Sequence, residues 1–231
     1  SIFDEFVEKL AEVVGMMRQG NTEDDDIGSM TFPKQIDIVK DQVVDALSQG
    51  AKLVTGDHPD KWDVSNGLFL KPMVVVDVNQ NMKIVTEESF GPVLPVLPFD
   101  NEDEAIRLAN DSLYGLNASV WSSDLEKAKR VVSKLVTGNA VINDVFISVA
   151  NHNLPFGGVK QSGIGRYHGE AGMRMFCHEK SVMVDSGKKN TEVQWYPYQG
   201  KYPQLVEIFK NVLGQRPDWK AVVKAYRRIT K

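Results

Sequence analysis

Apolar residues recur at helical spacing near the start of the chain. Between residues 2 and 17 they occupy positions 2, 3, 6, 7, 10, 13, 14 and 17, and Asp4 and Glu5 lie where a helix favours negative charge. A second amphipathic stripe begins behind Pro33, a favourable first-turn residue, and stops at Gly50. We therefore predict two amphipathic helices before the first strand.

Short apolar and β-branched runs follow, separated by polar segments. Pro72 interrupts the longest run, which indicates an edge strand or an irregular start. Two of the polar segments carry helix-start signals, namely Asp100 or Asn101 as an N-cap, and Ser123 with Glu126 as a capping box. The alternation of strands and helices is typical of a parallel α/β architecture. The strands are predicted at residues 51–55, 68–78, 93–99, 117–121 and 139–142.

The C-terminal part has a different pattern. Residues 180–184 predict one more strand, and a polar linker and an aromatic tail follow it. Helical patterns then cover residues 205–213 and 219–229. The sequence thus predicts a domain of residues 1–185 and a C-terminal tail of residues 186–231 that serves as an oligomerisation extension.

Composition narrows the classes of function. The net charge of −4 argues against a nucleic-acid partner. The single cysteine excludes an intrachain disulfide and fits a reducing compartment, so we expect a cytoplasmic protein. No apolar run approaches the roughly 20 residues of a membrane-spanning helix. The four histidines lack the spacing of metal ligands, and we expect no metal site and no membrane span.

Two segments concentrate the residues that could form a site. TEESFGPVLP, residues 86–95, sets two carboxylates before an aromatic residue and a Gly-Pro bend, and LPFGGVKQSGIGRYHG, residues 154–169, is rich in glycine. The glycine segment fails both generic phosphate-binding motifs, because Ile164 follows Gly163 and His168 replaces the third glycine of a dinucleotide fingerprint. A structural turn between sheet and helix is the plain alternative for it.

Several single residues also have plain interpretations. Glu88 alone would be a solvated carboxylate, and Phe90 alone would be a core residue. A thiol–base pair of Cys177 with His178 is disfavoured, since sequence neighbours rarely oppose each other. The apolar residues around Cys177 instead predict a buried structural cysteine. A solvated helix face is the simplest interpretation of the basic C-terminal residues Lys220, Lys224, Arg227, Arg228 and Lys231.

Three motifs carry a family resemblance. EESFGPV, DEAIRLANDSLYGLNASVWSSD and LPFGGVKQSGIGR occur in the order and spacing of the C-terminal half of the aldehyde dehydrogenase superfamily, and the chain resembles that half over residues 1–185. The run from Asn143 to Gly169 is most similar to the class 3 branch, whose members oxidise aromatic and longer-chain aliphatic aldehydes. The resemblance implies an α/β fold: an incomplete aldehyde-dehydrogenase-like catalytic domain with an open, mostly parallel sheet flanked by helices, and a C-terminal tail.

The resemblance assigns roles to four positions. It implies that Glu88 hydrogen-bonds the nicotinamide ribose of NAD or NADP and that Phe90 packs beside the nicotinamide, which would orient the ring for hydride transfer. Phe146 and Phe156 are implied as apolar residues at the aldehyde entrance. No catalytic residue is assigned, because the family's nucleophilic cysteine and general-base glutamate belong before the segment that matches Ser1.

The resemblance also implies a reaction. In the family, a cysteine thiolate attacks the aldehyde, hydride passes from the thiohemiacetal to NAD(P), and an activated water releases the carboxylic acid. Cys177 does not match that nucleophile, and the chain opens inside a helix without Met. We therefore expect part of a longer dehydrogenase, inactive by itself and a homodimer or tetramer when complete.

Two alternatives stay open. The first is a stand-alone α/β module that keeps the fold for binding or assembly and performs no chemistry. The second is a related semialdehyde dehydrogenase that makes a phosphorylated product. The glycine segment disfavours this second reading, because those enzymes differ there.

Overall fold

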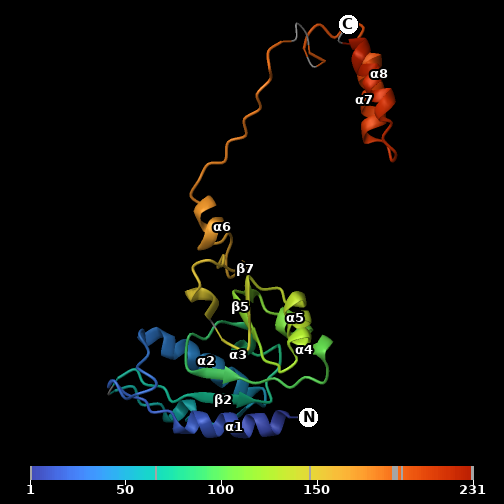
Figure 1. Ribbon diagram of the computed structural model, residues 1–231. Coiled ribbons are helices and arrows are strands. Elements are labelled where there is room, and N and C mark those ends of the chain that lie inside the picture. Colours follow the sequence, from blue (N-terminus) through green and yellow to red (C-terminus); the bar gives the residue numbers. More distant parts are fainter. Residues whose placement is uncertain (1, 66, 146, 189–191, 194, 230–231) are drawn as a thin grey trace. The chain divides into compact units, whose positions relative to one another are not determined.

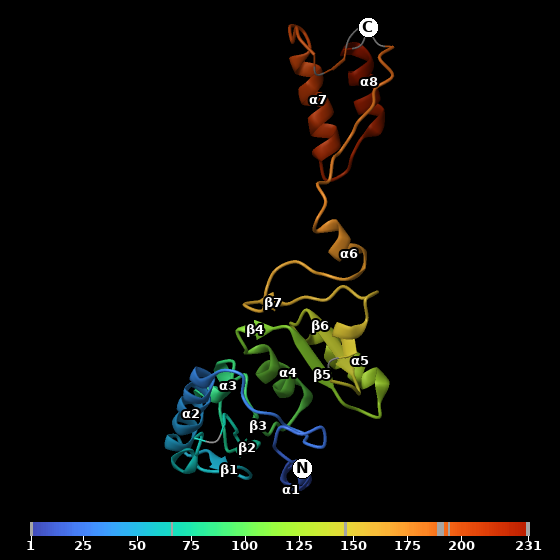
Figure 2. The same cartoon turned by 90° about the vertical axis from the view of Figure 1, so that its left-hand side faces the viewer.

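The chain divides into two compact units, Ser1–Cys177 and His178–Lys231, each described by itself (Figures 1 and 2). The computed structural model describes residues 2–65, 67–145, 147–188, 192–193 and 195–229. The predicted boundary after residue 185 stays a prediction.

Two amphipathic helices open the first unit, as predicted. Helix α1 spans Phe3–Met16, and α2 spans Pro33–Ser48 with its proline in the first turn. Helix α1 has no buried residue, whereas α2 buries one side of its surface. That side consists of Ile36, Val39, Gln42, Val43 and Ala46.

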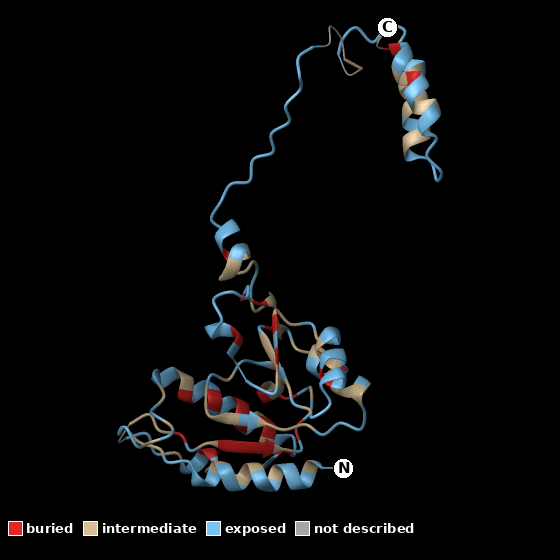
Figure 3. Cartoon of the chain, in the orientation of Figure 1, coloured by how far each residue is buried: buried red, intermediate tan, exposed pale blue. Residues whose placement is uncertain are grey.

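A three-stranded sheet forms the centre of this part. Strand β2 (Met73–Val76) pairs antiparallel with β1 (Lys52–Leu53) and parallel with β3 (Val93–Pro95). It begins directly after Pro72, so the irregular start expected from that proline is confirmed. Met73 and Val75 pack into the core with α2, while Val74 faces the other way, because side chains alternate along a strand. Figure 3 shows buried residues along β2 and on α2.

The predicted strand–helix–strand alternation is confirmed in the next segment. Strands β5 (Asn117–Val120) and β6 (Asn139–Ile142) pair in parallel, and α5 (Leu125–Lys134) connects them. Helix α4 (Glu102–Asn110) precedes them and is capped by the side chain of Asn101, which accepts a hydrogen bond from the Glu104 amide.

The capping box predicted at Ser123 is wrong. Helix α5 begins one residue later, and Asp124 is its cap, accepting from the Lys127 amide at 3.0 Å. An aspartate is as good a cap as a serine, and here it holds the position next to the first helical residue.

Short elements complete the first unit. Strands β4 (Tyr114–Gly115) and β7 (Val159–Lys160) pair antiparallel. In the described residues the strands form three small sheets and not one continuous sheet. The α/β class is nonetheless confirmed. The remaining helices are α3 (Lys83–Thr86), α6 (Gly169–Arg174) and the 3-10 turns η1 (Pro59–Lys61) and η2 (Ile147–Ala150).

The second unit ends in a helical hairpin, and the hairpin begins at residue 202. Helices α7 (Tyr202–Leu213) and α8 (Trp219–Ile229) are confirmed and pack on each other. The strand predicted over residues 180–184 is wrong: this run is exposed and extended, and in the described chain no neighbouring strand pairs with it. Alternating valines alone do not make a strand without a partner. Among the described residues, none of the helices has the length and apolar character to cross a membrane.

The burial predicted for Cys177 is also wrong. The residue is exposed at the end of the first unit, and its thiol contacts the Met173 carbonyl at 3.4 Å. Its apolar neighbours do not enclose it, because Met173, Met175 and Phe176 are themselves exposed, Phe176 by 91%.

Candidate functional site

Two glutamines of α2 anchor the backbone of the carboxylate segment. The side-chain amide of Gln42 donates to the Glu88 carbonyl at 3.3 Å, and that of Gln35 donates to the Ser89 carbonyl at 2.5 Å. Because these bonds use main-chain oxygens, they fix the backbone and leave the Glu88 side chain available. Gln42 is almost wholly buried, at 1% exposure.

Two aspartates of α2 hold the helix that leads into the segment. The Asp45 carboxylate accepts from the Lys83 amide at 2.9 Å, which satisfies one free N–H at the start of α3. The Lys83 ammonium pairs with Asp41 at 2.7 Å, and this hydrogen bond raises the pKa of the lysine. Helix α2 therefore holds residues 83–89 in place through its side chains.

A tight bend follows the carboxylates. Phe90 has a φ of 43°, in the left-handed region that non-glycine residues rarely adopt, and its side chain is 74% exposed. At Gly91 a Cβ atom would lie 2.7 Å from Cγ2 of Val39, so only glycine allows this approach to α2. The bend predicted at Gly91-Pro92 thus turns the Phe90 ring outward.

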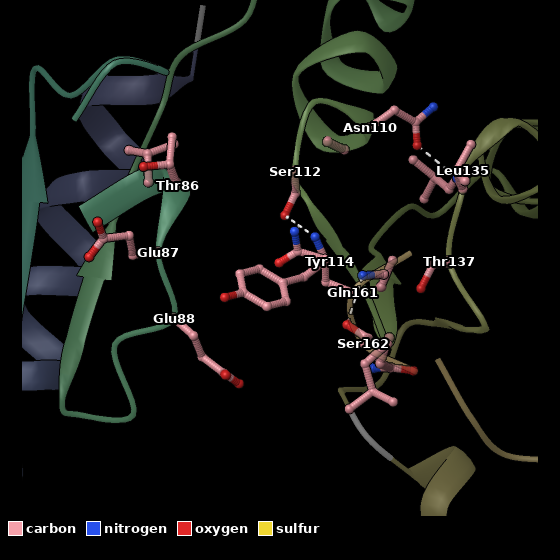
Figure 4. A pocket seen from close by; sticks show the side chains of 17 residues that line it. Thr86, Glu87, Glu88, Asn110, Ser112, Tyr114, Leu135, Thr137, Gln161 and Ser162 are labelled. Atoms are coloured by element: carbon pink, nitrogen blue, oxygen red, sulfur yellow. Dashed lines mark hydrogen bonds between the residues drawn. The ribbon is translucent and has the colours of Figure 1, made fainter. Parts of the chain in front are cut away.

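A cavity of about 540 Å³ opens beside this segment. Its walls come from residues 85–88, 109–110, 112, 114–118, 135–137 and 161–162. In Figure 4, Glu88 and Tyr114 extend into the space from opposite sides, whereas Glu87 turns back toward its own ribbon. The two segments singled out in the sequence meet here, because Gln161 and Ser162 belong to the glycine segment.

Glycines position the second of these segments. A Cβ at Gly138 would lie 1.8 Å from the Gly157 carbonyl, so the two loops touch through bare backbone. The Ser162 hydroxyl accepts a hydrogen bond from the Gly115 amide at 2.9 Å. The Lys160 ammonium donates to the main-chain carbonyls of Asn110 and Ser112. The glycine segment is thereby fixed along one wall of the cavity.

The cavity has both polar and apolar walls and the size of a small-molecule site. Its volume lies within the roughly 300–1,000 Å³ of typical ligand pockets. Glu88 supplies an anionic acceptor, and the buried Thr137 hydroxyl has no hydrogen-bond partner in the described chain. Within the described residues, no group of three His, Cys, Asp or Glu side chains could hold a metal ion. A carboxylate and hydroxyls suit a ligand that is rich in hydroxyl groups, such as a ribose.

The structure places the predicted site residues in different surroundings. Glu88 lines the cavity, and Phe90 projects outward two residues beyond it. Phe156 is 7% exposed, and its ring meets that of Tyr167 edge-on at 5.3 Å. Phe146 lies outside the described residues.

Sequence reasoning missed the residues that position the site. Gln42 falls on the apolar stripe of α2, three residues after Val39 and four before Ala46. A glutamine on such a stripe is buried by its place in the helix, and a buried amide requires polar partners. That signal could have indicated a polar contact with another segment, although not with which one.

Known proteins of similar sequence are enzymes that act on aldehydes. The chain is 45% identical over 196 residues to the 4,4'-diapolycopene aldehyde oxidase of a Methylomonas species, covering 85% of this chain and 36% of that protein. It is 37% identical to the betaine aldehyde dehydrogenase of Bacillus subtilis, covering 85% and 40%. The chain thus spans about two fifths of the length of these relatives.

Solved structures agree with this relationship. A betaine aldehyde dehydrogenase from Staphylococcus aureus in complex with NAD+ has a TM-score of 0.75 at 37% identity, covering 85% of this chain and 39% of that one. A Mycobacterium tuberculosis aldehyde dehydrogenase complexed with NAD+ has a TM-score of 0.73 at 38% identity, covering 81% and 38%. The model of the aldehyde dehydrogenase family matches residues 1–182. On the strength of this match, the chain belongs to the aldehyde dehydrogenase family of oxidoreductases.

Proposed function

We propose that this chain is the C-terminal portion of an NAD(P)-dependent enzyme that oxidises an aldehyde to a carboxylic acid. The observation that carries the proposal is the Glu88 carboxylate, which is held by an anchored backbone and directed into a cavity with hydroxyl groups in its walls. The NAD+ complexes of structural neighbours support a nicotinamide cofactor.

In this proposal the chain's own residues bind and orient the cofactor. Glu88 accepts hydrogen bonds from the hydroxyls of the nicotinamide ribose, and a carboxylate can accept two at once. Phe90, turned outward by its left-handed backbone, packs its ring beside the nicotinamide. When bound, the cofactor accepts a hydride from the substrate.

The nucleophile of the proposed reaction is a cysteine thiolate outside this chain. It attacks the aldehyde to form a thiohemiacetal, which becomes a thioester on oxidation, and water then releases the carboxylic acid. The short coverage of the relatives supports a longer protein that supplies this cysteine and the general base. Accordingly, the 231-residue chain alone would be inactive.

The substrate proposed is an aromatic or longer-chain aliphatic aldehyde, as in the class 3 branch. The run from Asn143 to Gly169 and the C-terminal extension support that branch. Phe146 and Phe156 are proposed as apolar residues at the aldehyde entrance. The complete enzyme is proposed to be a cytoplasmic homodimer or tetramer, which light scattering and cell fractionation would test.

Reduction of NAD or NADP by aldehydes tests the function. The complete protein, supplied in turn with an aromatic, a long-chain aliphatic and a betaine aldehyde, should form reduced cofactor fastest with one of the first two. The 231-residue chain should form none. A complete protein that reduces neither cofactor with any aldehyde would contradict the proposal and favour a non-catalytic module. A preference for betaine aldehyde would contradict only the class 3 substrate.

A further inference from the structure

Charge is distributed very unequally between the two units. The second unit has eleven Lys and Arg against five Asp and Glu, a net charge of +6, whereas the first unit has sixteen against 26, a net charge of −10. The net negative charge of the whole chain is therefore the sum of an acidic first unit and a basic second unit.

Helix α8 displays this positive charge on an exposed face. It carries no acidic residue, and one shallow groove along it is lined by Trp219, Lys220, Val223, Lys224, Arg227 and Arg228. Lys220, Lys224 and Arg228 recur every four residues, so they follow one side of the helix. Among the ion pairs of the described residues, only that of Arg228 with Glu207 involves this helix, and it is long, at 4.0 Å.

Apolar side chains accompany the cations instead of being buried. Trp219 is 62% exposed and Val223 47%, and on the neighbouring helix Phe209 and Leu213 are exposed by 59% and 79%. Only Ala225 and Ile229 of α8 are buried, so the hairpin has a small core. The outer side of α8 is thus cationic and partly apolar at once.

We propose that the α7–α8 hairpin docks on the surface of an anionic lipid bilayer through this face of α8. A basic amphipathic helix lies in the bilayer interface when its apolar side chains enter the headgroup region and its cations meet anionic lipids. Trp is favoured at that depth, and Lys and Arg can lay their aliphatic stems on apolar surface. A nucleic-acid phosphate backbone offers no apolar counterpart to the exposed Val223 of this face.

Vesicle sedimentation of the complete protein tests this docking. The protein should sediment with vesicles of phosphatidylcholine and phosphatidylglycerol, should not sediment with pure phosphatidylcholine, and should be released by salt. Replacing two cations, in Lys220→Ala/Lys224→Ala, should weaken binding about 30-fold, given the usual contribution of each cation near an anionic surface. Lys34→Ala/Lys40→Ala, which removes two exposed lysines of α2, is the matched control and should bind like the unaltered protein.

Four results would overturn the proposal. The first two are that the protein does not bind anionic vesicles, or that it binds neutral vesicles equally well. The third is that the two double variants bind anionic vesicles equally well. The fourth is that the protein binds an oligonucleotide at a salt concentration at which it no longer binds vesicles. If Lys220→Ala/Lys224→Ala lost self-association in light scattering but kept its vesicle binding, the occupant of the face would be a second copy of the chain. Aldehyde oxidation does not enter this test, so the docking and the proposed function can fail separately.

Discussion

Gly91 shows how one residue can determine where the side chain before it points. The bend after Glu88 brings the Gly91 backbone against Val39 of α2, and Phe90 accepts a left-handed conformation as a result. A non-glycine residue held there costs free energy, of the order of 1–3 kcal/mol, and persists only when its surroundings fix it. The anchors from Gln35 and Gln42 provide that restraint.

Substituting Gly91→Ala should therefore destabilise the first unit. The new methyl group would lie 2.7 Å from Cγ2 of Val39, and overpacking of this kind typically costs about 1–3 kcal/mol in the free energy of unfolding. Urea unfolding followed by circular dichroism measures it. The double variant Gly91→Ala/Val39→Ala should lose less than the sum of the single variants, because the smaller residue makes room.

Gly15→Ala is the matched control for this prediction. Nothing lies within 4 Å of a Cβ at Gly15, on an exposed position of α1, so alanine there should leave stability unchanged or raise it. Equal destabilisation at Gly15 and Gly91 would contradict the steric explanation.

At the scale of elements, α4 and α5 are joined by one strong ion pair. The Arg130 guanidinium donates to both oxygens of Glu102, at 3.0 and 2.7 Å, and Lys134 lies at 3.6 Å from the same carboxylate. The hydrogen bonds from Arg130 lower the pKa of Glu102 from 4.5 to about 2. This pair ties the two helices beside the β5–β6 ladder.

The ion pair predicts a pH dependence of stability. Because the folded-state pKa of Glu102 is depressed, its contribution is fully present above pH 4.5 and is lost as the pH falls toward about 2. In Glu102→Gln, the free energy of unfolding should fall less over this interval than in the unaltered protein. Parallel curves for the two proteins would contradict this role of the pair.

The cap of α5 gives a second prediction at this scale. Asp124→Ala removes the acceptor of the Lys127 amide and should lower the free energy of unfolding by about 1 kcal/mol. Ser123→Ala should leave it nearly unchanged, since Ser123 does not cap the helix. A larger loss of stability in Ser123→Ala than in Asp124→Ala would contradict the assignment of Asp124 and support the capping box predicted at Ser123.

For the molecule as a whole, local sequence patterns predicted the elements better than their assembly. Helical periodicity was sufficient for α1, α2, α7 and α8, since each depends on its own residues. Strands β5 and β6 also matched closely, and they pair with each other across the intervening α5. The failed strand at residues 180–184 and the exposed Cys177 depend on distant partners, which no local pattern reports.

The candidate site was predictable to a similar extent. Motif order singled out Glu88 and the glycine segment, and the structure brings both to one cavity. The anchoring amides of Gln35 and Gln42 act over about fifty residues of chain, and their targets are backbone carbonyls, which carry no sequence signature.

The most direct test of the proposed cofactor site compares the two adjacent carboxylates. In the complete protein, the dissociation constant for its nicotinamide cofactor should rise tenfold or more in Glu88→Gln, because a charged acceptor contributes roughly 1.5–3 kcal/mol to its hydrogen bonds. Glu87→Gln changes the neighbouring carboxylate, whose side chain turns back toward its own ribbon at the edge of the cavity, and should bind the cofactor like the unaltered protein. Equal affinity in Glu88→Gln and the unaltered protein would contradict the account.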